Sequence, residues 1–223
     1  MMDTTQQQIS DRQTSFWMIT ALAVVMFGIM FVIRQAGAFD FWYWMSMNLV
    51  VLISLAVITD MENLRLFRED ISHKLPKKIL MGLGFAVLLY LIFFVGNYFI
   101  RLIFENAGQG INNVYAFKQD APSWRIVLLM ALIIGPGEEI FWRGYLQRRM
   151  GKKWGATTGF IVATLLYTVV HLATGNMVLV LAAFVCGAFW GWLYKTLHSV
   201  TINIVSHTVW DILVFIVLPF SGM

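Results

Sequence analysis

The chain has 223 residues, of which 59% are hydrophobic and only 13% are charged. This composition, with a mean hydropathy of +0.73, excludes an ordinary soluble domain and predicts an integral membrane protein. The net charge of +4 comes mainly from short polar connections, where basic residues set membrane orientation, so we expect no nucleic-acid partner. Several uncharged runs are long enough to cross the bilayer as helices, which predicts an all-α, polytopic helical bundle.

Three uncharged spans come first in chain order, at Phe16–Ile33, Phe41–Ile58 and Ile79–Ile100. We expect the first span to be retained, because no small-residue cleavage pattern follows it. Residues 60–78 form a polar connection with five basic residues. An interfacial helix and a solvated loop fit this connection equally well. A segment rich in Gly, Asn and Gln then extends to about Ser123 and is expected to be irregular.

The fourth predicted span, Trp124–Met150, is one long helix in which the apolar periodicity continues past two adjacent glutamates. The sequence Gly135-Pro136-Gly137 precedes these glutamates and predicts a break or kink in the helix. The remaining spans complete a predicted bundle of about seven helices: Ala156–Leu172, Met177–Tyr194 and Val200–Leu218.

The basic residues are divided unequally between the two ends of these spans. Twelve of the sixteen Lys and Arg residues fall on one side of the predicted layout, and Arg34, Arg101, Lys118 and Arg125 fall on the other. By the positive-inside rule the richer side is cytoplasmic. We therefore expect a cytoplasmic N-terminus and an external C-terminus.

Ionisable side chains within the spans are confined to spans four, five and seven. They are Glu138, Glu139, Arg143, His171, His207 and Asp211. Such groups are costly in lipid and are tolerated where they face the bundle interior or a water-filled cavity. The three spans are therefore expected to face one another and to share one site.

The two adjacent glutamates have different neighbours along their helix. Glu139 and Arg143 are four positions apart with the acid first, which favours a structural ion pair on one helix face. Glu138 projects about 100° away from Glu139 and has Trp142 at the corresponding position. We expect Glu138 to be the freer carboxylate.

Two further pairs with four-residue spacing lie on the later spans. His207 and Asp211 share one face of span seven, and Tyr167 and His171 share one face of span five. Along straight helices measured from the cytoplasmic ends, Glu138 lies ~18 Å deep, His171 ~24 Å and His207 ~10 Å. Tilted or shifted helices are needed to bring them together.

Span six carries small residues instead of ionisable chemistry. Ala183, Gly187 and Gly191 recur at four-residue steps, a pattern that permits close helix packing in lipid. The chain's single cysteine, Cys186, lies on the same span, so an intrachain disulfide and a cysteine-based metal cluster are excluded. We expect span six to serve as a scaffold.

These residues resemble the motifs of the CPBP family, the CAAX proteases and bacteriocin-processing enzymes, also called Abi proteins. Residues Glu138 to Gly144 are similar to the Glu-Glu-x-x-x-Arg motif, and Tyr167 to His171 to the Phe-x-x-x-His motif. Phe184 to Gly191 resembles the glycine-containing third motif, and His207 to Asp211 resembles His-x-x-x-Asn or Asp. The resemblance covers roughly Pro136 to Asp211.

The resemblance implies an intramembrane endopeptidase that hydrolyses a peptide bond of a membrane-associated protein or peptide in a bacterial cell membrane. The predicted spans divide the chain into a cytoplasmic tail (1–15), N-terminal transmembrane helices and loops (16–123) and a catalytic core of the CPBP type (124–223). Bacteriocin-like peptides or signalling precursors are expected as substrates rather than prenylated proteins. The implied catalytic residues are Glu138, Glu139, His171, His207 and Asp211.

Within that set, the resemblance makes Glu138 the general base on a water that His171 orients. It makes His207 and the residue at position 211 the groups that steady the oxyanion. Many members have Asn where this chain has Asp211, and an ionised Asp cannot donate a hydrogen bond to an oxyanion. Asp211 would therefore be protonated, act through His207, or bind a cation. Tyr167, in place of Phe, is a mild departure.

A metal requirement is left open by the residues. Glu138, His171, His207 and Asp211 are chemically suitable ligands for zinc or another divalent metal. The chain has no His-Glu-x-x-His motif. Both a metal-dependent and a metal-free hydrolase therefore fit the sequence.

Two functions other than proteolysis also fit the buried polar groups. A proton-coupled transporter can use the same side chains to relay protons. A non-proteolytic immunity or scaffold protein would act through contacts alone. Proteolysis is favoured because amide hydrolysis needs a base, imidazoles and water in one place.

Overall fold

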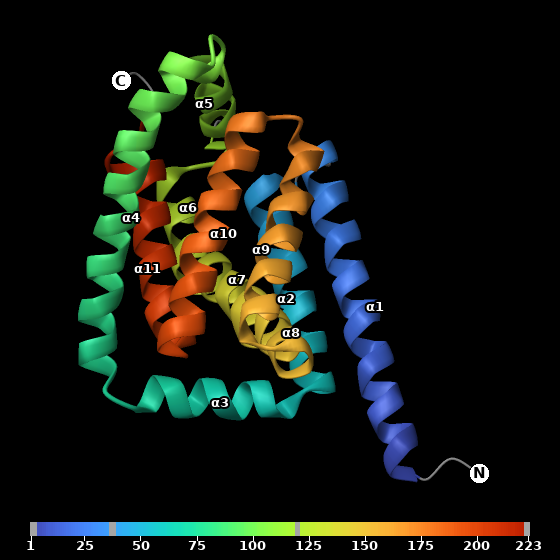
Figure 1. Cartoon of the computed structure of the whole chain (residues 1–223). Coiled ribbons are helices and arrows are strands. Elements are labelled where there is room, and N and C mark those ends of the chain that lie inside the picture. Colours follow the sequence, from blue (N-terminus) through green and yellow to red (C-terminus); the bar gives the residue numbers. More distant parts are fainter. Residues whose placement is uncertain (1–3, 36–38, 119–120, 221–223) are drawn as a thin grey trace.

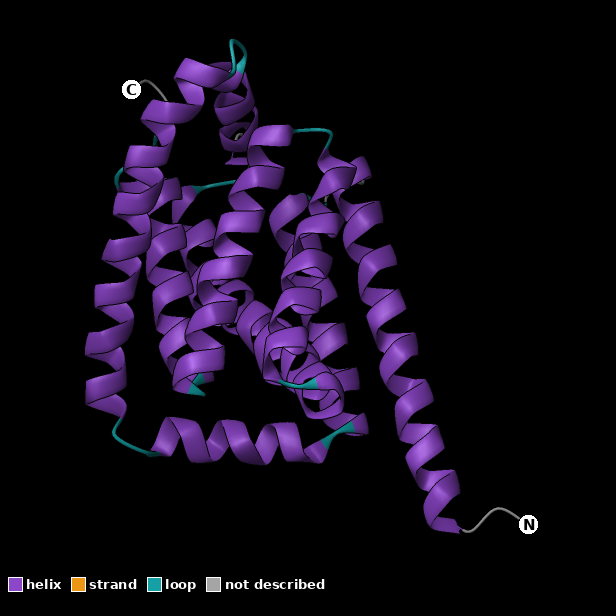
Figure 2. Cartoon of the chain, viewed as in Figure 1, coloured by secondary structure: helices purple, strands orange, loops and turns teal. Residues whose placement is uncertain are grey.

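The structure is a computed structural model that describes residues 4–35, 39–118 and 121–220. It is a bundle of helices joined by short connections (Figures 1 and 2). The elements are α1 (Thr4–Ile33), α2 (Phe41–Thr59), α3 (Met61–Ser72), α4 (Leu75–Ile103), α5 (Ala107–Tyr115), η1 (Ala116–Lys118), α6 (Ser123–Leu129), η2 (Met130–Ile134), α7 (Gly135–Glu138), η3 (Glu139–Gln147), α8 (Arg148–Trp154), α9 (Ala156–His171), η4 (Leu172–Thr174), α10 (Met177–Leu197), α11 (Val200–Ile212) and η5 (Leu213–Val217).

The predicted polytopic helical bundle is confirmed. Within the described residues, six helices are long and apolar enough to cross a membrane, and they include α1, α2, α4, α9, α10 and α11. The predicted fourth span is helical from Ser123 to Trp154 but consists of alternating α and π segments, and it carries buried charged residues. The predicted count of seven spans is therefore not confirmed. Helix α1 begins at Thr4, inside the predicted tail, and the proposed division into three regions stays a prediction.

The Gly-Pro-Gly sequence does not break the fourth helix. Gly135 keeps helical dihedral angles (φ −56°, ψ −51°), and π-helical segments, η2 and η3, lie on either side of α7. Such π turns are frequent at functional sites. A Cβ atom at Gly135 would lie 2.2 Å from the Thr208 hydroxyl oxygen. Glycine thus allows α7 to pack directly against α11, which carries His207.

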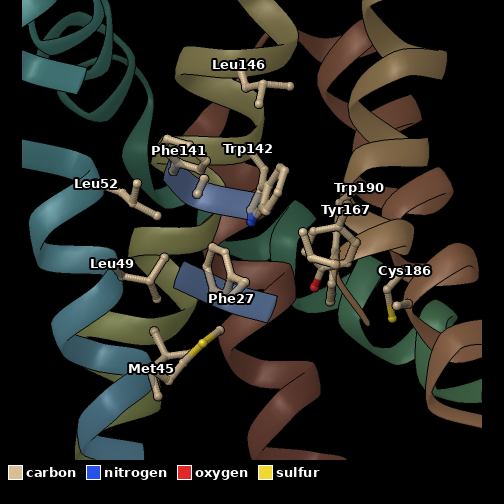
Figure 3. Packing of buried hydrophobic residues seen from close by; sticks show 14 of the residues in the cluster. Phe27, Met45, Leu49, Leu52, Phe141, Trp142, Leu146, Tyr167, Cys186 and Trp190 are labelled. Carbon is tan, nitrogen blue, oxygen red and sulfur yellow. The ribbon is translucent and has the colours of Figure 1, made fainter. Parts of the chain in front are cut away.

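The centre of the apolar core joins α1 and α2 to the π-helical segment η3 (Figure 3). The side chains that meet there are almost completely buried: Phe27, Leu49, Leu52, Phe141, Trp142 and Leu146. The Phe27 and Trp142 rings, for example, have centroids 5.8 Å apart. Because η3 also carries Glu139 and Arg143, this packing fixes the position of charged residues in the bundle interior.

Small residues allow α10 to pack closely against α9, as predicted. A Cβ atom at Gly187 would lie 3.1 Å from the Tyr167 ring, and one at Gly191 would lie 2.9 Å from the Phe160 ring. The backbone oxygen of Gly187 also accepts a hydrogen bond of 3.2 Å from Thr164. Helix α10 is therefore a scaffold that positions Tyr167.

Helix α3 lies across one end of the bundle (Figure 1), so the helical alternative for residues 60–78 is confirmed. Its acidic residues join it to neighbouring helices. Asp60 forms an ion pair with Arg148, and Glu62 pairs with Lys152 at 2.6 Å. Whether α3 lies in the membrane interface stays a prediction.

Asp70 joins three elements at this end of the bundle. Its Oδ1 lies 2.5 Å from the Lys78 ammonium of α4. Its Oδ2 accepts hydrogen bonds of 2.7 Å from both the backbone N–H and the hydroxyl of Thr201, at the start of α11. Burial by itself raises the pKa of Asp70, but the hydrogen bonds from Lys78 and Thr201 outweigh burial and hold the pKa below its ordinary value.

A lowered pKa makes Asp70 a source of acid-sensitive stability. Its contribution is present above the unfolded-state pKa of about 3.9 and is lost as the pH falls through the lower folded-state pKa. We expect Asp70→Asn to lower the unfolding temperature in detergent at neutral pH and to weaken its further fall below about pH 4. An identical pH dependence in both proteins would contradict this role.

Candidate active site

The predicted site residues come together around one cavity. Its volume is ≈ 520 Å³, and its wall includes Glu138, Tyr167, His171, His207 and Asp211. Each of these residues is buried, with at most 9% of its surface exposed. They project from α7, α9 and α11, which belong to predicted spans four, five and seven.

Glu139 is the centre of a buried hydrogen-bond network beside the cavity. Its Oε1 lies 2.8 Å from Arg143 Nη1 and 2.6 Å from His207 Nδ1. Its Oε2 accepts a hydrogen bond of 3.0 Å from the Asn203 amide. The predicted Glu139–Arg143 ion pair is therefore observed, and Glu139 contacts the cavity through His207.

The orientation of His207 is fixed on several sides. Because a carboxylate only accepts, His207 Nδ1 donates its proton to Glu139. This leaves Nε2 directed toward Glu138 Oε2 at 3.7 Å and toward Asp211 Oδ2 at 3.5 Å. The imidazole also stacks on Trp190, with ring centroids 3.7 Å apart and planes inclined by 19°.

Glu138 presents its carboxylate on the cavity wall. The Tyr167 hydroxyl donates a hydrogen bond of 2.8 Å to Glu138 Oε2. Glu138 thus has one close side-chain donor, whereas Glu139 has three, which agrees with the expectation that Glu138 is the freer carboxylate. The CPBP motif Phe-x-x-x-His has phenylalanine at the position of Tyr167, so the hydroxyl that makes this bond is the group by which this chain departs from the motif.

His171 lies one helical turn beyond Tyr167 on the same cavity wall. Its Nδ1 is 2.7 Å from the backbone oxygen of Tyr167, so Nδ1 donates and Nε2 retains a lone pair. Its ring packs against Phe31 with centroids 4.8 Å apart. The four-residue offset along α9 corresponds to about 6 Å of rise. Because of this offset, Tyr167 and not His171 lies level with Glu138 and reaches its carboxylate. The offset also accounts for the greater depth expected for His171 than for Glu138 on straight helices.

Three residues near the site were not among the predicted site residues, because none of them has an ionisable side chain. Asn203 donates to both Glu139 and the backbone oxygen of Trp190, and it stands four positions before His207. Trp190 supplies the ring beneath His207. Trp210 lines the cavity, and its buried indole N–H has no hydrogen-bond partner among the described residues. The sequence offers a signal for Asn203, because a polar residue one turn from His207 lies on the same helix face. It offers no such signal for the two tryptophans.

The metal requirement stays a prediction. In the described residues, no group of three or more His, Cys, Asp or Glu side chains is placed so that it can hold a metal ion. The Nδ1 atoms of His171 and His207 already face the Tyr167 carbonyl and the Glu139 carboxylate. These hydrogen bonds fix the two rings and leave Nε2 of each as the nitrogen that could bind a metal.

Fold and site together define a class: an integral membrane helical bundle with a carboxylate and two imidazoles around one cavity. A family model described as "Type II CAAX prenyl endopeptidase Rce1-like" matches residues 120–213. This model is of the CPBP family, so the predicted resemblance is confirmed over these residues. No curated protein and no solved structure matches the chain.

Proposed function

We propose that the protein is an intramembrane endopeptidase that hydrolyses a peptide bond of a membrane-associated protein or peptide. The observation that carries the proposal is the Glu138 carboxylate on the cavity wall, between the Tyr167 hydroxyl and His207 Nε2. The family match supports a protease. Neither the proton-coupled transporter nor the immunity protein is favoured by these findings.

Glu138 is the proposed general base. Its carboxylate accepts a proton from a water molecule while the water oxygen attacks the carbonyl carbon of the scissile amide. The same carboxyl then delivers that proton to the leaving nitrogen as the carbon–nitrogen bond breaks. The lone pair on His171 Nε2 can accept a hydrogen bond from the water and orient it.

His207 is the proposed donor to the oxyanion that forms on the substrate carbonyl. A proton on Nε2 would point toward the cavity, and the carboxylates of Glu139 and Asp211, at 2.6 and 3.5 Å, would stabilise the resulting imidazolium. Asp211 then acts through His207, one of the three roles left open by the sequence. Glu139 is a positioning residue, because it holds the ring through Nδ1.

We propose a bacterial cell membrane as the location, with the N-terminus on the cytoplasmic side. The unequal distribution of basic residues supports this orientation. The largely apolar cavity wall, which includes Phe93, Phe99 and Leu181, suits an apolar stretch of polypeptide. The zinc requirement stays a prediction that metal analysis of the purified protein tests.

The proposed function is tested by comparing the peptides in membranes of cells that produce either the wild-type protein or Glu138→Gln. We expect peptide products that depend on Glu138. Identical peptide profiles, together with proton flux in proteoliposomes that depends on His171 and His207, would contradict proteolysis and support a carrier. If the double variant Glu138→Ala, His207→Ala fully restores the phenotype of cells that lack the protein, the result would support a scaffold instead.

The Tyr167 hydroxyl is expected to fix the Glu138 carboxylate without being indispensable. Tyr167→Phe keeps the ring between Trp142 and Gly187 but removes one hydrogen bond to a carboxylate. We expect kcat/KM to fall by about 10- to 100-fold, the equivalent of one hydrogen bond to a charged group. A loss as large as that of Glu138→Gln would contradict this ranking, and so would unchanged kinetics.

A further inference from the structure

A second cavity adjoins the candidate active site and has a different character. Its volume is ≈ 470 Å³. It shares with the first cavity the wall residues Ile100, Phe104, Phe117, Val178, Leu179 and Leu181. Its remaining wall is rich in amide side chains and includes one guanidinium: Arg34, Asn106, Gln109, Asn113 and Asn176. We call this second cavity the polar vestibule.

The polar vestibule lies toward one end of the bundle, and the first cavity extends from it to Glu138 and His207 in the bundle interior. The walls of both cavities include residues from the C-terminal half of α4, from α5 and from the beginning of α10. Figure 1 places α5 and the beginning of α10 at the end opposite α3. The cavities therefore adjoin the end of the bundle that α3 does not cover.

The basic side chains gather at the α3 end. Those on α3, at the start of α4, on α8 and near the end of α10 are Arg65, Arg68, Lys74, Lys77, Lys78, Arg148, Arg149, Lys152, Lys153 and Lys195. The vestibule end carries Arg34, Arg101, Lys118 and Arg125. An excess of Lys and Arg in short loops marks the cytoplasmic side of a membrane protein. By this rule α3 faces the cytoplasm.

We infer that the active site receives its substrate from the extracytoplasmic side of the membrane through the polar vestibule. The substrate class is a polypeptide whose scissile bond lies at the outer leaflet, not a C-terminal segment exposed to the cytoplasm. The amides of Asn106, Gln109 and Asn113 can bind the N–H and C=O groups of an extended backbone, and the adjoining apolar cavity can hold apolar side chains. The Asn176 amide is instead bonded to Gly110 and to the first turn of α10. This inference rests on the proposed function for its substrate and on the structure for its direction.

The direction of access is tested by cysteine labelling in whole cells, which requires no catalytic activity. In a full-length Cys186→Ala background, Asn113→Cys reports on the vestibule and Arg68→Cys reports on α3. Both positions are exposed. We expect a membrane-impermeant maleimide to label Asn113→Cys in intact cells and Arg68→Cys only after permeabilisation. Gln109→Cys and Arg65→Cys form a second pair if either variant fails to accumulate. The reverse pattern, or equal labelling at both ends, overturns the inference.

The substrate side is tested with one cleavable peptide placed on either flank of a single transmembrane helix. We expect cleavage when the peptide faces outward and loss of cleavage when it faces the cytoplasm. Cleavage of only the cytoplasmic version overturns the inference. If labelling shows an outward vestibule and no peptide that the wild-type protein cleaves is found, the proposed proteolysis fails while the direction of access stands.

Discussion

Glu138→Gln is expected to reduce peptide hydrolysis by about 10²–10⁴-fold, the usual contribution of a general base. Glutamine has nearly the same shape and can still accept the hydrogen bond from Tyr167, but it cannot take a proton from water. The protein should therefore insert and fold as the wild type does. Steady-state cleavage of an identified membrane peptide, together with the unfolding temperature in detergent, measures both effects.

The matched control is Glu69→Gln, which makes the same chemical change on α3 at the other end of the bundle. Glu69 is exposed, and among the described residues its carboxylate pairs only with Arg65 on the helix surface, at 3.7 Å. Exposed pairs of this kind contribute little stability, so cleavage should remain at the wild-type level. Retained cleavage in Glu138→Gln would remove the central residue from the proposed mechanism. Equal losses in both variants would point to a general effect of charge.

Glu139→Gln is expected to impair both folding and catalysis. Its carboxylate is 0% exposed and neutralises Arg143, which is itself 2% exposed. Leaving one member of a buried ion pair without its partner costs roughly 3–5 kcal/mol of unfolding free energy. His207 also loses the anionic acceptor on Nδ1, so kcat should fall at least about tenfold. KM should change little, because Glu139 acts on substrate only through His207.

A double-mutant cycle separates the two effects of Glu139. Replacing Arg143 with Met as well removes the unpaired charge, so the double variant should be more stable than the sum of the single losses implies. Its kcat should remain low, because His207 is still without the Glu139 carboxylate. Recovery of kcat along with stability would show that Glu139 has only a structural role.

Much of the architecture could be predicted because apolar length and uncharged composition are local properties. The long spans of α2, α4 and α10 follow from apolar runs that are long enough to cross the hydrocarbon layer as helices. The Glu139–Arg143 pair follows from four-residue spacing on one helix. The segment around the glutamates was harder to predict, because π turns preserve helical dihedral angles despite Pro136. Its charges also make the number of spans ambiguous.

By itself, the sequence determined that this is a polytopic membrane protein, which helices carry ionisable groups, and which family motifs they resemble. Only the tertiary structure decided which of these groups touch. It placed Tyr167, one turn before His171, against Glu138, and it placed His207 between Glu138 and Glu139. It also placed the polar vestibule at the end away from most of the basic residues. The physical reason is that spacing along one helix fixes a face but not the offset between helices. That offset depends on contacts such as Gly135 with α11 and Gly187 with α9.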